Sequence, residues 1–88
     1  MGWLDLPTKS QINVLYGWFR WKMPTAEAKD ALDWLEKNAT RRQVSEEMGR
    51  VRKLYIANNL TREDCFNSPV WKDYFNTKVK EEEKNERD

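Results

Sequence analysis

The chain has 88 residues and carries 16 Lys and Arg against 15 Asp and Glu, a formal net charge of +1. This length permits one domain with a small core. A nearly equal number of positive and negative charges is not typical of a dedicated nucleic-acid binder. The sequence contains no His and a single Cys, so an internal disulfide and the usual zinc sites are excluded. We expect neither a metal ion nor a cofactor.

Two further classes of protein are disfavoured. No apolar run approaches the roughly 18 residues of a membrane span, and the first residues have neither a basic start nor a hydrophobic segment. We therefore expect a cytoplasmic protein with no membrane partner. Without His, a nucleophile and its base would have to come from ordinary surface charges, and Asp64 beside Cys65 disfavours a reactive thiolate. We expect no enzymatic activity.

Helix starts recur along the chain. A Thr followed three residues later by Gln fits the capping box, in which two side chains satisfy backbone amides that the first helical turn leaves free. The full pattern occurs at Thr8 and Thr40, and a weaker version with Asp in place of Gln occurs at Thr61. Two more starts adjoin a proline, at Thr25 and Ser68. Helices are therefore predicted near residues 9–23, 26–38, 41–57, 62–66 and 69–80.

Apolar residues recur at helical spacing on one side of each longer predicted helix. The expected core residues are Ile12, Leu15, Tyr16, Phe19 and Met23; Ala28, Ala31, Leu32, Leu35 and Ala39; Val44, Met48, Val51, Leu54 and Tyr55; and Val70, Trp71, Tyr74 and Phe75. No window alternates cleanly, so strands are not expected. The predicted fold is all-α, a compact bundle of four or five short helices at residues 1–79. Residues 80–88 form a charged tail without an apolar residue, expected to be a frayed helix end or disordered.

A weak internal similarity at an offset of 32 residues aligns Thr8 with Thr40 and Gly17 with Gly49. A Gly inside a helix costs about 1 kcal/mol relative to Ala, so two at equivalent positions call for a reason. Close approach between helices is one explanation, and coincidence is the other.

The first predicted helix is unusually aromatic. At about 100° per residue, Val14, Trp18 and Trp21 gather on the side opposite Ile12 and Phe19. An uncovered apolar stripe marks an interaction site, and Trp is the residue most enriched at binding hot spots. We therefore predict Val14, Trp18 and Trp21 as partner-binding residues. The alternative is that aromatic side chains of the last helix cover them as a second layer of core.

The third predicted helix is basic. Arg42, Arg50 and Lys53 fall on the face away from its apolar side, so they are expected to point to solvent. They are candidate charged contacts for a protein partner, or for nucleic acid if this helix acts as a recognition helix. An ordinary solvated face is the other interpretation.

A Thr-x-x-Gln-Ile start, a helical Leu-x-x-Leu and a second Thr-x-x-x-x-Ser start follow one another along the chain. The matching residues are Thr8, Gln11 and Ile12, then Leu32 and Leu35, then Thr40 and Ser45. This layout, over residues 8–55, resembles a small tri-helical segment of phage and mobile-element proteins of bacteria. The resemblance implies a small accessory protein of that type, found beside nucleic-acid machinery. The aromatic run from Tyr16 to Trp21 departs from the segment's usual polar outer face.

These features favour a non-enzymatic protein-binding module, a small phage-type adaptor or inhibitor that docks on a larger host or viral protein through the aromatic helix face. Two alternatives stay open. One is a nucleic-acid-binding helical module that uses the basic third helix. The other is a homodimer in which a second copy covers the aromatic stripe.

Overall fold

The computed structural model describes residues 5–86, with side chains for residues 5–80. Its elements are α1 (Lys9–Phe19), α2 (Thr25–Asn38), α3 (Arg41–Ile56), α4 (Arg62–Cys65) and α5 (Pro69–Glu86). The described residues contain no strand, so the predicted all-α bundle is confirmed. Two boundaries differ from expectation: α1 ends at Phe19 rather than near residue 23, and α5 continues past residue 80. Residues 87–88 of the charged tail lie outside the described residues.

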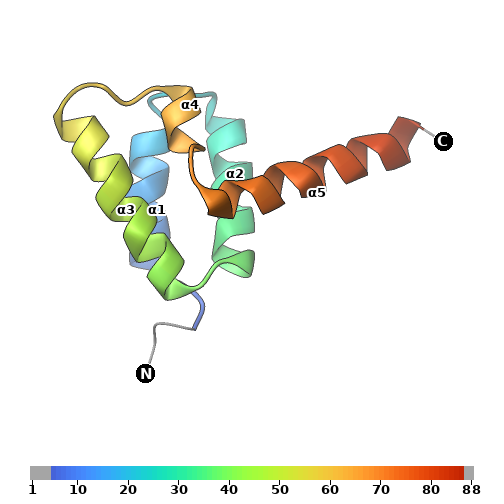
Figure 1. The fold of residues 1–88 in the computed structure, drawn as a ribbon, viewed down its shortest axis with the longest axis horizontal. Helices are drawn as coiled ribbons and strands as arrows, with labels where there is room; N and C mark the ends of the chain where they lie inside the picture. Colours follow the sequence, from blue (N-terminus) through green and yellow to red (C-terminus); the bar gives the residue numbers. More distant parts are fainter. Residues whose placement is uncertain (1–4, 87–88) are drawn as a thin grey trace.

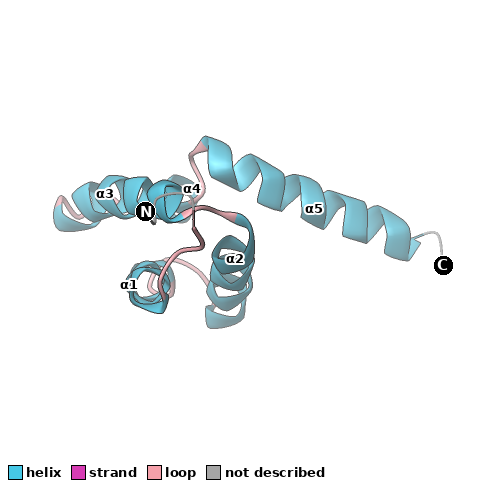
Figure 2. Ribbon diagram, turned by 90° about the horizontal axis from the view of Figure 1, so that it is seen from below, coloured by secondary structure: helices cyan, strands magenta, loops and turns pink. Residues whose placement is uncertain are grey.

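The helices form two layers. Figure 2 views α1 and α2 nearly end-on in one layer, with α3, α4 and α5 lying across them in the other. The main helix contacts are those of α1 with α2 and α3, and of α2 with α5. Only the beginning of α5 lies against the bundle, and the rest of that helix extends away from it (Figure 1). The hydrophobic core is therefore centred on α1, α2 and α3.

Local side-chain hydrogen bonds explain where most helices begin. At Thr8 and Thr40, the hydroxyl accepts from the amide of the Gln three residues on, and that Gln side chain accepts from the Thr amide. The Thr61 hydroxyl accepts from the Asp64 amide. The start of α2 differs, because Pro24 occupies the cap position and no side chain bonds there. The sequence therefore located all five starts, but not every cap.

Most of the expected core is buried. The buried members are Ile12, Leu15, Phe19, Met23, Ala28, Ala31, Leu32, Leu35, Ala39, Val44, Val51, Trp71 and Tyr74. Two expected members are exposed instead: 44% of Tyr55 and 39% of Phe75 is accessible to solvent. Leu60 and Cys65, which flank the cap at Thr61, are also buried and add the short α4 to the core.

The two helical glycines have no packing role within the described residues. A Cβ built at Gly17 or at Gly49 meets no heavy atom within 4 Å. The hypothesis of close helix approach is therefore wrong, because both positions face open space. Each glycine keeps its cost in backbone entropy without a compensating contact.

Replacing either glycine should stabilise the protein. Gly17→Ala and Gly49→Ala are each expected to raise the free energy of unfolding by up to about 1 kcal/mol, because alanine restricts the unfolded chain and meets no obstacle in the helix. Urea unfolding followed by circular dichroism measures the change. A loss of stability in either variant would show that a neighbouring group comes closer than the structure indicates.

The caps give a second prediction. Thr40→Ala should lower the free energy of unfolding by about 1 kcal/mol, because the Gln43 amide at the start of α3 loses the hydroxyl that accepts its hydrogen bond. Thr77→Ala is the matched control, since the Thr77 hydroxyl only donates to the Asp73 carbonyl within an exposed turn of α5. Equal losses in the two variants would argue against the capping role of Thr40.

Candidate functional site

The predicted aromatic stripe is divided in the structure. Trp18 is half-buried and packs beside the core, with its ring centroid 5.9 Å from that of Tyr55 on α3. Val14 is 40% exposed and Trp21 is 68% exposed. Because α1 ends at Phe19, Trp21 lies in the following turn, where helical spacing no longer fixes its direction. Trp18 is therefore largely structural, while Trp21 remains available to a partner.

The last helix does not supply a second core layer over this stripe. Trp71 is fully buried, with ring centroids 5.8 Å from Phe19, 5.0 Å from Phe66 and 6.1 Å from Trp34. These contacts place it within the main core, between the two layers. The surface that carries Trp21 is bordered by α3 instead.

Trp21 shares this surface with the end of α3. Tyr55 and Ile56 are 44% and 67% exposed, and together with Trp21 they line an open hollow of about 410 Å³. Lys22, Asn58 and Leu60 complete its lining. We call Trp21, Tyr55 and Ile56 the Trp21 patch. Three large apolar side chains exposed around one hollow are typical of an interaction site rather than of scattered surface residues.

The turn after α3 shapes one side of the hollow. Asn58 has a φ of 59°, in the left-handed region that Asn tolerates better than most residues. The Asn59 amide donates to the Leu54 carbonyl oxygen and the Asn58 amide to that of Tyr55, which closes the end of the helix. The chain then reverses toward the buried Leu60. This termination leaves Ile56 exposed on the last turn of α3.

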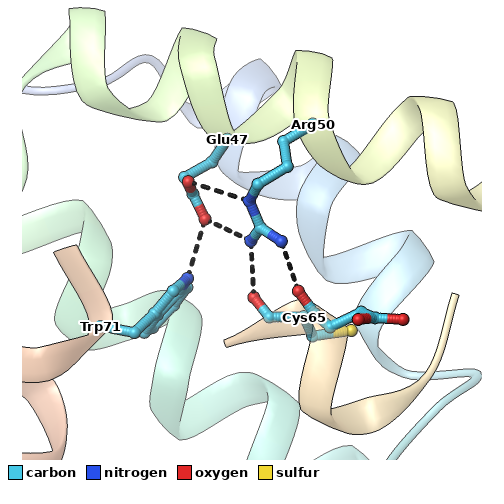
Figure 3. A network of polar contacts seen from close by, with 5 residues as sticks. Glu47, Arg50, Cys65 and Trp71 are labelled. Atoms are coloured by element: carbon cyan, nitrogen blue, oxygen red, sulfur yellow. Dashed lines mark hydrogen bonds and ion pairs between the residues drawn. The ribbon is translucent and has the colours of Figure 1, made fainter. Parts of the chain in front are cut away.

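The expected row of solvent-facing cations on α3 is wrong for Arg50. Figure 3 shows its guanidinium between Glu47 and the backbone of α4. Its Nη2 lies 2.6 Å from Glu47 Oε1 and donates to the Cys65 carbonyl oxygen at 3.0 Å, and its Nη1 donates to the carbonyl oxygen of Asp64. Arg50 therefore joins α3 to α4 and is not available to phosphates or to a partner.

Glu47 is the centre of this network. It is only 6% exposed, and its Oε1 also accepts a hydrogen bond of 2.9 Å from Trp71 Nε1 (Figure 3). A buried carboxylate is tolerated when it is paired and hydrogen-bonded. The carboxylate thus links α3 to α5, while Arg50 links the same turn to α4.

The other two predicted cations are exposed. Arg42 forms an i,i+4 ion pair of 3.4 Å with Glu46, with both side chains about 70% exposed. Lys53 lies on the solvent side of the last turn of α3. Because Arg50 is engaged and Arg42 is paired, the three residues do not form one basic surface. If α3 were a recognition helix, Arg50 would therefore not be available to contact nucleic acid.

Two further ion pairs fix the outer helices to α2. Arg62 on α4 lies 2.6 Å from Glu27, and Lys78 on α5 lies 2.6 Å from Asp30. Tyr74 also donates to Asp30 at 2.8 Å. The hydrogen bonds from Lys78 and Tyr74 lower the pKa of the Asp30 carboxyl. Burial, followed by the hydrogen bond to Asp30, raises the pKa of Tyr74.

The Cys65 thiol lies in the core of the protein. Cys65 is fully buried, and burial raises the pKa of its thiol to about 11. Such a thiol carries little thiolate at neutral pH. Within the described residues no three carboxylate or thiol groups are placed to hold a metal ion. No helix in that part of the chain has the length and apolar character to cross a membrane.

Three members of these sites were not selected from the sequence. Ile56 could have been found, since it lies outside the apolar side of its helix and directly before the turn. Tyr55 was placed in the core because its spacing from Val51 is helical. Glu47 gave no local signal, because its partner Trp71 is 24 residues away in sequence.

Comparison with known proteins adds no relative. No family model matches the chain. Neither a curated protein nor a solved structure matches it. Function is therefore inferred from the surface of the molecule itself.

The buried network predicts that replacing two arginines of α3, Arg50 and Arg42, will lower the stability of the protein by different amounts. Arg50→Met should lower the free energy of unfolding by about 3 kcal/mol or more, because it leaves the Glu47 carboxylate buried without its charge partner. Arg42→Met is the matched control, and its exposed ion pair should contribute about 0.5 kcal/mol or less. Urea unfolding of both variants gives the comparison.

A double change tests the coupling itself. Glu47→Gln in the Arg50→Met background should cost less than the sum of the single changes, because no unpaired charge remains. Additive losses would mean that Glu47 and Arg50 act independently, contrary to the observed geometry.

Proposed function

We propose that this chain is a non-enzymatic protein-binding module, a small cytoplasmic adaptor or inhibitor that docks on a larger protein through the Trp21 patch. The observation that carries the proposal is the exposure of Trp21 and Ile56 around one hollow, on residues that the core does not need. Large side chains of this kind bind tightly where a partner removes them from water, and Trp is prominent among them. Val14, also exposed, extends the apolar surface along α1.

Support for this function also comes from the contacts on the α3 side of the patch. The ring of Tyr55 packs beside that of Trp18, and the turn after Ile56 is closed by backbone hydrogen bonds. A preformed surface loses little conformational entropy on binding. The resemblance to phage accessory proteins is compatible with an adaptor or inhibitor, and it remains a hypothesis about origin.

Replacing Trp21 and Ile56 together by Ala should separate binding from folding. Since both side chains are about two-thirds exposed, we expect the free energy of unfolding to change by less than about 1 kcal/mol. Partner binding should weaken by at least about 2 kcal/mol, the loss expected at a hot spot. The measurements are urea unfolding, and capture from a lysate of the source cells, with and without nuclease treatment, followed by quantitative mass spectrometry.

Val79→Ala is the control, because Val79 is 51% exposed on the distant α5. Proteins retained by wild type and by Val79→Ala, but not by the Trp21/Ile56 variant, are partners of the patch. Equal retention by all three forms would place the binding surface elsewhere. Loss of capture on nuclease treatment would favour nucleic acid as the ligand, and sedimentation of the purified chain tests the homodimer.

A further inference from the structure

Charge is strongly segregated around the Trp21 patch. Residues 13–26 and 48–61, which contribute the patch and its borders, carry five Lys and Arg and no Asp or Glu. The ten acidic residues up to Val79 all lie in other segments, several of them on α2. These two segments thus bring cations and no carboxylates to the surface around the patch, in a chain with a net charge of only +1.

Most of these cations have no role in the fold. Arg50 is held by Glu47. Within the described residues, no ion pair joins a carboxylate to Arg20, Lys22, Arg52 or Lys53. Arg20 lies against the patch itself, with its guanidinium carbon 5.2 Å from the centre of the Trp21 ring. Lys22 lines the hollow, and Arg52 precedes Tyr55 and Ile56 by three and four residues, the spacing of neighbours on a helix.

Helix ends explain only part of this charge. The carboxyl ends of α1 and α3 both lie here, and cations compensate the negative pole of a helix. Each pole is equivalent to about half an elementary charge, so two poles account for about one of the four cations. The rest repel one another across the surface, and an anionic partner would remove that repulsion.

The chemistry at the centre distinguishes between anionic partners. Ile56, the most exposed aliphatic side chain of the patch, offers no flat ring on which a base could stack. Strand-binding surfaces combine a basic groove with successive aromatic platforms, whereas the short hollow here is lined by one exposed aliphatic side chain together with two rings. An apolar side chain of a peptide fits this arrangement better than a nucleotide does.

We propose that the Trp21 patch receives an acidic amphipathic segment of a partner protein. Apolar side chains of that segment cover Trp21, Tyr55 and Ile56, and its carboxylates pair with the surrounding cations. The inference rests on the proposed function and adds the chemical class of its partner.

The test uses the full-length chain to select binders from a display library of random peptides. Selected peptides should combine Asp and Glu with large apolar residues. Their affinity should fall as salt is raised, and should fall by between about twofold and thirtyfold in Arg52→Gln/Lys53→Gln, the range for two exposed ion pairs. Arg42→Gln, on the same helix and outside the patch, is the control and should bind with unchanged affinity.

The outcomes separate the two proposals. Neutral or basic peptides that lose binding in Trp21→Ala/Ile56→Ala would overturn the acidic partner and leave the docking surface in place. Peptides that bind this variant normally would overturn the proposed function as well. Three other results would overturn the proposal that the partner is an acidic protein segment. The library could yield no enriched binders, or a single-stranded oligonucleotide could bind more tightly than any selected peptide. The chain could also form a salt-sensitive dimer through the patch.

Discussion

One buried carboxylate connects three helices of this small protein. Glu47 accepts from Trp71 of α5 and pairs with Arg50, whose guanidinium in turn donates to two carbonyl oxygens of α4. Without this network, α4 and the start of α5 would meet α3 mainly through apolar contacts, which fix distance better than orientation. Directional hydrogen bonds in a low-dielectric interior specify one arrangement, because any other leaves a charge unpaired.

Ion pairs within and between the helices determine which cations are available on the surface. Arg50, Arg62 and Lys78 each pair with a carboxylate that fixes one helix against another. The cations near Trp21 have no such partner within the described residues. The ion pairs that orient the helices and the cations that surround the Trp21 patch therefore occupy different parts of the molecule. A balanced overall composition hides this division, because the net charge sums over both.

The features that could be predicted from the sequence are those that depend on residues close together along the chain. The helix starts depend on residues three apart, such as Thr40 and Gln43, and these were located closely. The apolar sides of α1 and α2 follow from spacing alone. Arg50 was misplaced because its role depends on Glu47 being buried by Trp71, a contact between distant segments. Trp21 was predicted to bind a partner because of a position on α1 that it does not occupy. It is exposed in the turn that follows the early end of α1.

The short α4 has a consequence for the dynamics of the chain. Four residues make few helical hydrogen bonds of their own, and the last two carbonyls of α4 are satisfied by the side chain of Arg50. Opening of α4 therefore breaks the hydrogen bonds that Arg50 donates to Asp64 and Cys65, and we expect α4 and this turn of α3 to form one cooperative unit of local unfolding. The thiol of Cys65 lies inside that unit. Its rate of alkylation under native conditions therefore reports that opening, and no cysteine has to be introduced for the measurement.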